Sequence, residues 1–174
     1  NVMHVGKRNA GCEYVMKVND ELQKINVCEN EKDLGITFDS DFSFDIHIQR
    51  VVAKANQMLG IIKRSFTFLD KEVFLYLYKA LVRPHLEYGN VIWNPYLKRQ
   101  SIQIEKVQRR ATKLLKECQQ MTYTERLLYL NLHSLKGRRL RGDLIQTFKI
   151  FNQVVDVDVS SLFSLSLIDN TRNP

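Results

Sequence analysis

Apolar residues recur at steps of three and four along most of the chain after residue 43, which is the period of an α-helix with one buried face. Asp70 stands directly before one of these segments, where its carboxylate suits the N-cap position. Pro84 interrupts the same segment, and it should kink or end the helix because proline lacks the amide donor and clashes with the preceding turn. The pattern predicts helices over residues 44–66, 70–83, 98–117, 122–132 and 133–153.

The first forty residues show a different pattern, with short apolar runs separated by turn-forming residues. The runs "VMHV" at 2–5 and "CEYVMKV" at 12–18 flank "GKRNAG", whose two glycines and basic residues predict a hairpin turn. A third run, "LGITFD" at 34–39, predicts another strand. We therefore expect a mainly α protein, in which a helical bundle of about five helices is preceded by a small antiparallel β element.

These patterns divide the chain into four segments. They are a β element (1–42), a three-helix bundle (43–117), a helical extension (118–153) and a loosely ordered tail (154–174). In the second helix, the spacing predicts a buried face made of Val73, Phe74, Leu77, Ala80 and Leu81. In the last helix, helical spacing is kept by Leu140, Leu144, Ile145, Phe148 and Phe151.

Positive charge is concentrated in the middle of the chain. The net charge is +7 overall, but it is −4 for residues 1–45, +9 for residues 46–118 and +2 for residues 119–174. At helical period the cations form stripes on the three helices of the bundle: Arg50, Lys54, Arg64, Lys79, Arg83, Lys106, Arg109, Arg110 and Lys113. Such stripes can bind phosphate groups, or they can simply be the solvated face of a bundle, and charge alone does not decide between these interpretations.

No motif of a catalytic or metal site occurs in the sequence. The four histidines lie far apart without a carboxylate or cysteine at ligand spacing, and the three cysteines fit no CxxC pattern. Asp39 and Asp41 could hold Mg²⁺ together with a phosphate, although a turn followed by a helix cap is the simpler interpretation. We expect no catalytic residue, no metal ligand and no cofactor in this chain. Since no apolar run reaches 18 residues, we expect no membrane partner either.

Five blocks of the sequence carry a resemblance to a known family. The chain resembles the C-terminal part of reverse transcriptases from non-LTR retrotransposons, the LINE and jockey-like elements, from about Val2 to Phe151. The blocks occur in the family's order, and five together are far more specific than any one of them. They are "EKDLGITFDSDFSFDIHI", "KANQMLGIIKRSF", "LYKALVRPHLEYGNVIWNPYL", "IEKVQRRATKLL" and "RRLRGDLIQTFKIF".

The resemblance implies a role for each part of the chain. "NVMHVGK" would be the last strand of the polymerase palm, and "DLGI" would lie at the palm–thumb junction, where Asp33, Leu34 and Gly35 would support the primer end. The helices from Phe44 to about Glu117 would be the thumb, which grips the template–primer duplex through its backbone. Residues 118–153 would be a helical extension behind the thumb.

The same resemblance implies partners that lie outside this chain. They are an RNA–DNA or DNA duplex, and the palm and fingers upstream in the same polyprotein, acting inside the cell in the nucleus. The metal-binding aspartate box of the family does not occur in the sequence. Mg²⁺ would therefore be held by the parent polymerase, and this chain alone should not polymerise.

Other functions fit the same residues. The chain could be a helical interaction or nucleic-acid-binding module, a decayed retroelement fragment without a polymerase partner, whose cations mainly keep it soluble. A dedicated DNA-binding domain that reads bases in the major groove would prefer one sequence, whereas a thumb would bind duplexes of any sequence. Because the chain begins with Asn, we expect it to be part of a longer protein.

Overall fold

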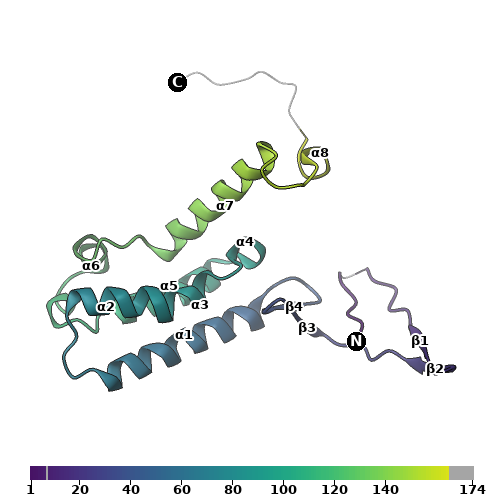
Figure 1. The fold of residues 1–174 in the computed structure, drawn as a ribbon, viewed down its shortest axis with the longest axis horizontal. Helices are drawn as coiled ribbons and strands as arrows, with labels where there is room; N and C mark the ends of the chain where they lie inside the picture. The colour runs from purple at the N-terminus through teal and green to yellow at the C-terminus, as the bar shows by residue number, and fades with distance from the viewer. Residues whose placement is uncertain (7, 165–174) are drawn as a thin grey trace.

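The computed structural model describes residues 1–6 and 8–164, and Figure 1 shows a helical bundle with a small β region at the N-terminal end. The predicted fold class, mainly α with a preceding antiparallel β element, is confirmed. Of the predicted tail, residues 165–174 lie outside the described residues. The helices are α1 (Asp45–Ser65), α2 (Lys71–Leu77), α3 (Arg83–Glu87), α4 (Asn90–Trp93), α5 (Lys98–Thr112), α6 (Tyr123–Tyr129), α7 (Leu135–Phe151) and α8 (Val159–Leu162).

The β region consists of two separate hairpins. β1 (Val15–Val18) pairs with β2 (Glu21–Lys24), and β3 (Asn30–Asp33) pairs with β4 (Ile36–Asp39), both antiparallel. The predicted hairpin between residues 2–5 and 12–18 is wrong, because Val2 instead forms an isolated parallel bridge with Val27. β1 turns back at the dipeptide Asn19–Asp20, where both residues have positive φ, the conformation that a two-residue hairpin turn requires.

The turn between β4 and α1 is organised by Asp39. Its carboxylate accepts backbone N–H groups from Ser43 at 2.8 Å and from Phe44 at 2.7 Å. For the Asp39–Asp41 pair, the geometry therefore favours the turn before a helix over the Mg²⁺ site. No group of three or more His, Cys, Asp or Glu side chains that could hold a metal ion occurs in the described part of the chain.

Three helical rods enclose the core: α1, α5, and the continuous run from α2 to α3. Each rod contributes one apolar face, as the three-and-four spacing predicts. Asp70 caps α2 as predicted, accepting the Val73 N–H at 2.8 Å. The buried side chains that form this core include Ile48, Ala55, Leu59, Ile62, Phe74, Tyr78, Val82, Leu86, Ile104, Val107, Ala111 and Leu115.

The second helix does not stop at Pro84. α2 passes without a break through a π-helical turn, η1 (Tyr78–Val82), into α3. A proline ring clashes with the fourth preceding carbonyl in a regular α-helix, and the wider π turn makes room for it. The chain therefore stays helical across the position where the sequence suggested a kink or an end.

The π turn also changes which residues of this rod are buried. In a regular α-helix, side chains four residues apart drift by about 40° per step around the axis, because each residue turns by about 100°. The wider turn cancels part of that drift, so Phe74, Tyr78, Val82 and Leu86 form one buried row. Of the predicted face, Phe74 is buried and Leu77 is partly buried, whereas the prediction is wrong for three residues that are exposed: Val73, Ala80 and Leu81.

α6 and α7 follow the bundle, and α7 runs obliquely away from it (Figure 1). Thr122 and Glu125 form the capping box at the start of α6. The first two backbone N–H groups of α7 bind the Glu105 carboxylate of α5, so this acid anchors the helix start. No helix in the described residues is long and apolar enough to cross a membrane.

Candidate nucleic-acid interface

α1 and α5 run side by side in the same direction. At their first turns, Arg99 Nη2 lies 2.6 Å from Asp45 Oδ2. Eleven residues further along both helices, Arg110 Nη1 donates to Asn56 Oδ1 at 2.5 Å. Because both contacts join residues 54 positions apart in the sequence, the two helices keep the same register over their length. Side chains one turn apart on α1 and on α5 therefore line one edge where the two helices meet, which we call a seam.

Near the C-terminal ends of α1 and α5, this seam becomes strongly basic. Arg64 folds back along α1, so that its Nη1 lies 3.5 Å from the place a Cβ on Gly60 would occupy. Gly60 is one turn beyond Asn56, and this spacing puts Arg64 on the edge that faces Arg110. A cleft of about 330 Å³ at the helix ends is lined by Lys63, Lys113 and Lys116, together with Glu117.

We call the five cations at this end of α1 and α5 the basic seam. All five side chains are exposed, and Glu117 is the one acid that lines the same cleft. Three of them belong to the predicted set of binding residues, and two, Lys63 and Lys116, do not. The members of the basic seam are Lys63, Arg64, Arg110, Lys113 and Lys116.

Several predicted cations lie elsewhere. Lys106 is exposed one turn before Arg110 and extends the same edge of α5. Lys54 is two residues from Asn56 and so lies about 160° around α1, away from α5. Arg50 turns toward the β region, where its Nη1 donates to Thr37 Oγ1 at 2.8 Å.

The remaining predicted cations contact other parts of the fold. The Arg109 guanidinium lies 4.1 Å from the centre of the Tyr123 ring, a cation–π contact with α6. Arg83 Nε lies 3.6 Å from Glu87 Oε2, and this acid also binds an arginine of α7. Lys79 is exposed on the π turn. The structure therefore brings Arg64, Lys106, Arg110 and Lys113 together and separates the other five.

The loop predicted to support a primer end is the tight turn between β3 and β4. Leu34 and Gly35 both have positive φ there, and Asp33 is the exposed last residue of β3. Tyr88 donates its hydroxyl to the Leu34 carbonyl at 2.9 Å, which fixes the turn against the bundle. The Leu34 side chain itself is 81% exposed. An apolar tip thus projects from a firmly held turn.

Three titratable groups with shifted pKa values lie at contacts between elements of the fold. Burial raises the pKa of Tyr78, whose hydroxyl donates to Gln108 Oε1 at 2.6 Å in the core. Burial and a hydrogen bond to Glu105 raise the pKa of Tyr123. Burial, and then the Arg50 charge, lower the pKa of His47, whose Nδ1 accepts the Thr37 N–H. Each of these groups holds elements together.

Comparison with known proteins yields one informative match. No protein family matches the chain, and no solved structure matches it. The chain is 26% identical over 161 residues to an uncharacterized protein of Caenorhabditis elegans, an alignment covering 88% of this chain and 79% of that protein. The relative's name states no activity.

Proposed function

We propose that this chain is the thumb and post-thumb segment of a retroelement RNA-directed DNA polymerase, which holds a template–primer duplex by its phosphate backbone. The observation that carries the proposal is the basic seam, where five exposed cations from α1, from the end of α5 and from the turn that follows it lie on one edge. The five sequence blocks and the +9 charge of residues 46–118 support the same conclusion.

The proposed contact is electrostatic and independent of base sequence. From Lys106 to Lys113 the cation row on α5 is about 10 Å long at about 1.5 Å per residue. A duplex carries one negative charge per about 1.7 Å of its axis, so this row faces about six charges. Arginine adds a planar fork that matches phosphate oxygens. In the parent polymerase, the turn with the outward Leu34 would lie beside the primer end.

The test measures how binding depends on salt. If the five seam cations and Lys106 all contact phosphates, the slope of log affinity against log salt is about −5.4, and affinity falls about 1,800-fold between about 50 and about 200 mM salt. Replacing Arg64, Arg110 and Lys113 by alanine should reduce the slope to about −2.7 and the fall to about 42-fold. Fluorescence anisotropy with a labelled RNA–DNA hybrid gives both quantities.

Two controls distinguish the effect of the basic seam on binding from the effect of the protein's net charge. Replacing Lys17, Lys24 and Lys32 by alanine removes the same charge from the exposed β region and should leave the slope nearly unchanged. Arg109→Ala, next to Arg110 but facing Tyr123, should weaken binding less than Arg110→Ala.

Three outcomes would overturn the proposal. An unchanged slope in the triple variant would show that phosphates bind elsewhere. Absence of binding to any duplex at low salt would favour an interaction module whose cations only solvate it. A strong preference for one duplex sequence would instead indicate a domain that reads bases in the major groove.

A further inference from the structure

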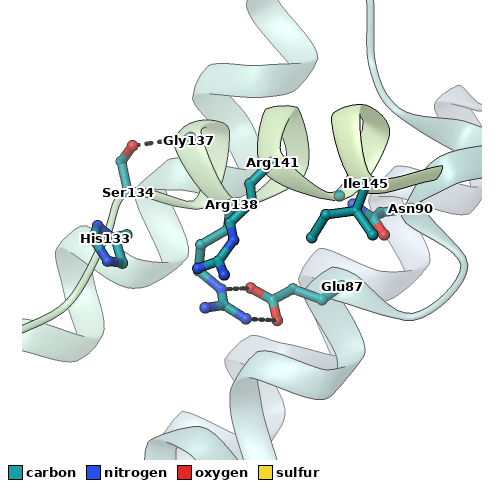
Figure 2. A pocket seen from close by; sticks show the side chains of 9 residues that line it. Glu87, Asn90, His133, Ser134, Gly137, Arg138, Arg141 and Ile145 are labelled. Atoms are coloured by element: carbon teal, nitrogen blue, oxygen red, sulfur yellow. Dashed lines mark hydrogen bonds and ion pairs between the residues drawn. The ribbon is translucent and has the colours of Figure 1, made fainter. Parts of the chain in front are cut away.

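After Leu135, which is buried in the core at its start, α7 packs against the bundle through polar side chains. Arg139 is buried and donates from Nη2 to Ser101 Oγ of α5 at 3.0 Å. Arg138 binds both carboxylate oxygens of Glu87, as Figure 2 shows, with Nη2 at 3.0 Å from Oε2. Asp143 accepts a hydrogen bond from the Asn94 side chain. A surface helix normally buries its apolar side, so this arrangement leaves the apolar side of α7 exposed.

The exposed side is a continuous apolar stripe, which we call the outer face of α7. Leu144 and Phe148, one turn apart at its centre, are 62% and 64% exposed. The stripe is about 16 Å long at about 1.5 Å per residue, which is the length of three helical turns. Its residues are Leu140, Leu144, Ile145, Phe148 and Phe151. Contiguous exposed apolar surface of this kind marks an interaction site.

Arg141 places a positive charge at the edge of the outer face, because it is exposed and lies about 60° around the helix from Leu144. The one acid of α7, Asp143, lies about 100° from Leu144 in the other direction and accepts the hydrogen bond from Asn94. Beside the stripe lies a cavity of about 550 Å³, with Ile145 and Arg141 in its lining (Figure 2). Arg141 has no ion-pair or hydrogen-bond partner among the described residues, so this flank offers a free cation next to an apolar surface.

We propose that the outer face of α7 is a docking surface for an amphipathic helix that carries acidic residues beside its apolar stripe. A single helix matches the three-turn length of the face, and an acidic side chain entering the adjacent cavity would reach Arg141. The outer face of a second copy fits less well, because it would bring Arg141 rather than an acid to this edge. A flat anionic bilayer would not use a cavity on one flank. The inference does not depend on duplex binding.

The experiment uses two synthetic peptides and the whole chain. Both peptides carry leucine at every third or fourth position; one has glutamate along both flanks and the other has lysine there. Anisotropy of the labelled peptides should show saturable binding of the glutamate peptide, with affinity at least about tenfold above that of the lysine peptide. Arg141→Ala should reduce this preference, and Leu144→Asp with Phe148→Asp should lower affinity by more than about tenfold.

A matched control keeps the result interpretable. Leu128→Asp introduces the same charge at an exposed leucine of α6 and should leave peptide binding unchanged. Circular dichroism confirms that each variant is folded. Equal affinity for both peptides, or no saturable glutamate-peptide binding up to about 1 mM, the weak limit of specific association, would overturn the proposal. Binding instead to phosphatidylcholine vesicles with about 30% phosphatidylserine, lost in the Leu144 and Phe148 variant, would assign the face to a membrane.

Discussion

Glu87 holds α7 onto the bundle, and removing its charge should measurably loosen that attachment. Its carboxylate, whose side chain is 22% exposed, lies against Arg138 of α7 and Arg83 of α3. A hydrogen bond to a charged group contributes about 1.5–3 kcal/mol, and partial solvent screening favours the lower part of this range. We therefore expect Glu87→Gln to lower the free energy of unfolding by about 2 kcal/mol. For a chain of this length, the Tm would fall by about 4–8 °C.

A double-mutant cycle, measured by urea denaturation of four proteins, isolates the interaction energy between Glu87 and Arg138 from their other contacts. The four proteins are the wild type, Glu87→Gln, Arg138→Met and the double variant, and the double-mutant cycle should give a coupling energy of about 1.5 kcal/mol. Glu72→Gln, at an exposed acid of α2, is the control and should change stability by less than about 0.5 kcal/mol. A coupling energy near zero would refute the reasoning, because it would make the pair an ordinary surface contact.

Three further predictions concern the core and the β region. Trp93 is fully buried, so Trp93→Ala should cost about 3–5 kcal/mol in urea denaturation, and a loss below about 1 kcal/mol would contradict its core role. The folded-state pKa of His47 lies below the ordinary value of about 6.5, so the unfolded chain binds the proton more readily. Stability should therefore be complete above about pH 6.5 and fall at lower pH, and His47→Asn should flatten this dependence. Gly89 has φ +62, and a Cβ there would lie 2.8 Å from Ile36 Cδ1, so Gly89→Ala should lower the Tm, whereas Gly60→Ala within α1 should raise it slightly.

The sequence predicted the positions of single helices better than the contacts between them. The three-and-four spacing located α1 and α5, and Asp70 marked the start of α2, because these signals are local. Spacing assigns residues to a face of one helix, but it does not say which neighbour that face meets. Arg109 and Arg110 therefore looked equivalent, although one stacks on Tyr123 and the other bonds to Asn56.

The remaining failures have the same origin. Leu81 fits the α-helical face that begins at Phe74, but the π turn, which no local pattern announced, places Tyr78 and Val82 on the buried side instead. The apolar residues of α7 keep the spacing of a buried face, yet the half-buried Arg138 and the buried Arg139 orient the helix through partners far away in the sequence. Lys63 was missed because only the parallel packing of α1 and α5 brings it to the seam.

The π turn at Tyr78–Val82 affects the contact between the bundle and α7, although α7 lies far away in the sequence. Without it, the row from Phe74 to Leu86 would drift by about 120° over its three steps, and α3 would be rotated relative to α2. Glu87, one residue beyond Leu86, would turn with it and move away from Arg138. The wide turn, which accommodates the ring of Pro84, thus keeps Glu87 in register with Arg138 and so contributes one of the contacts that orient α7.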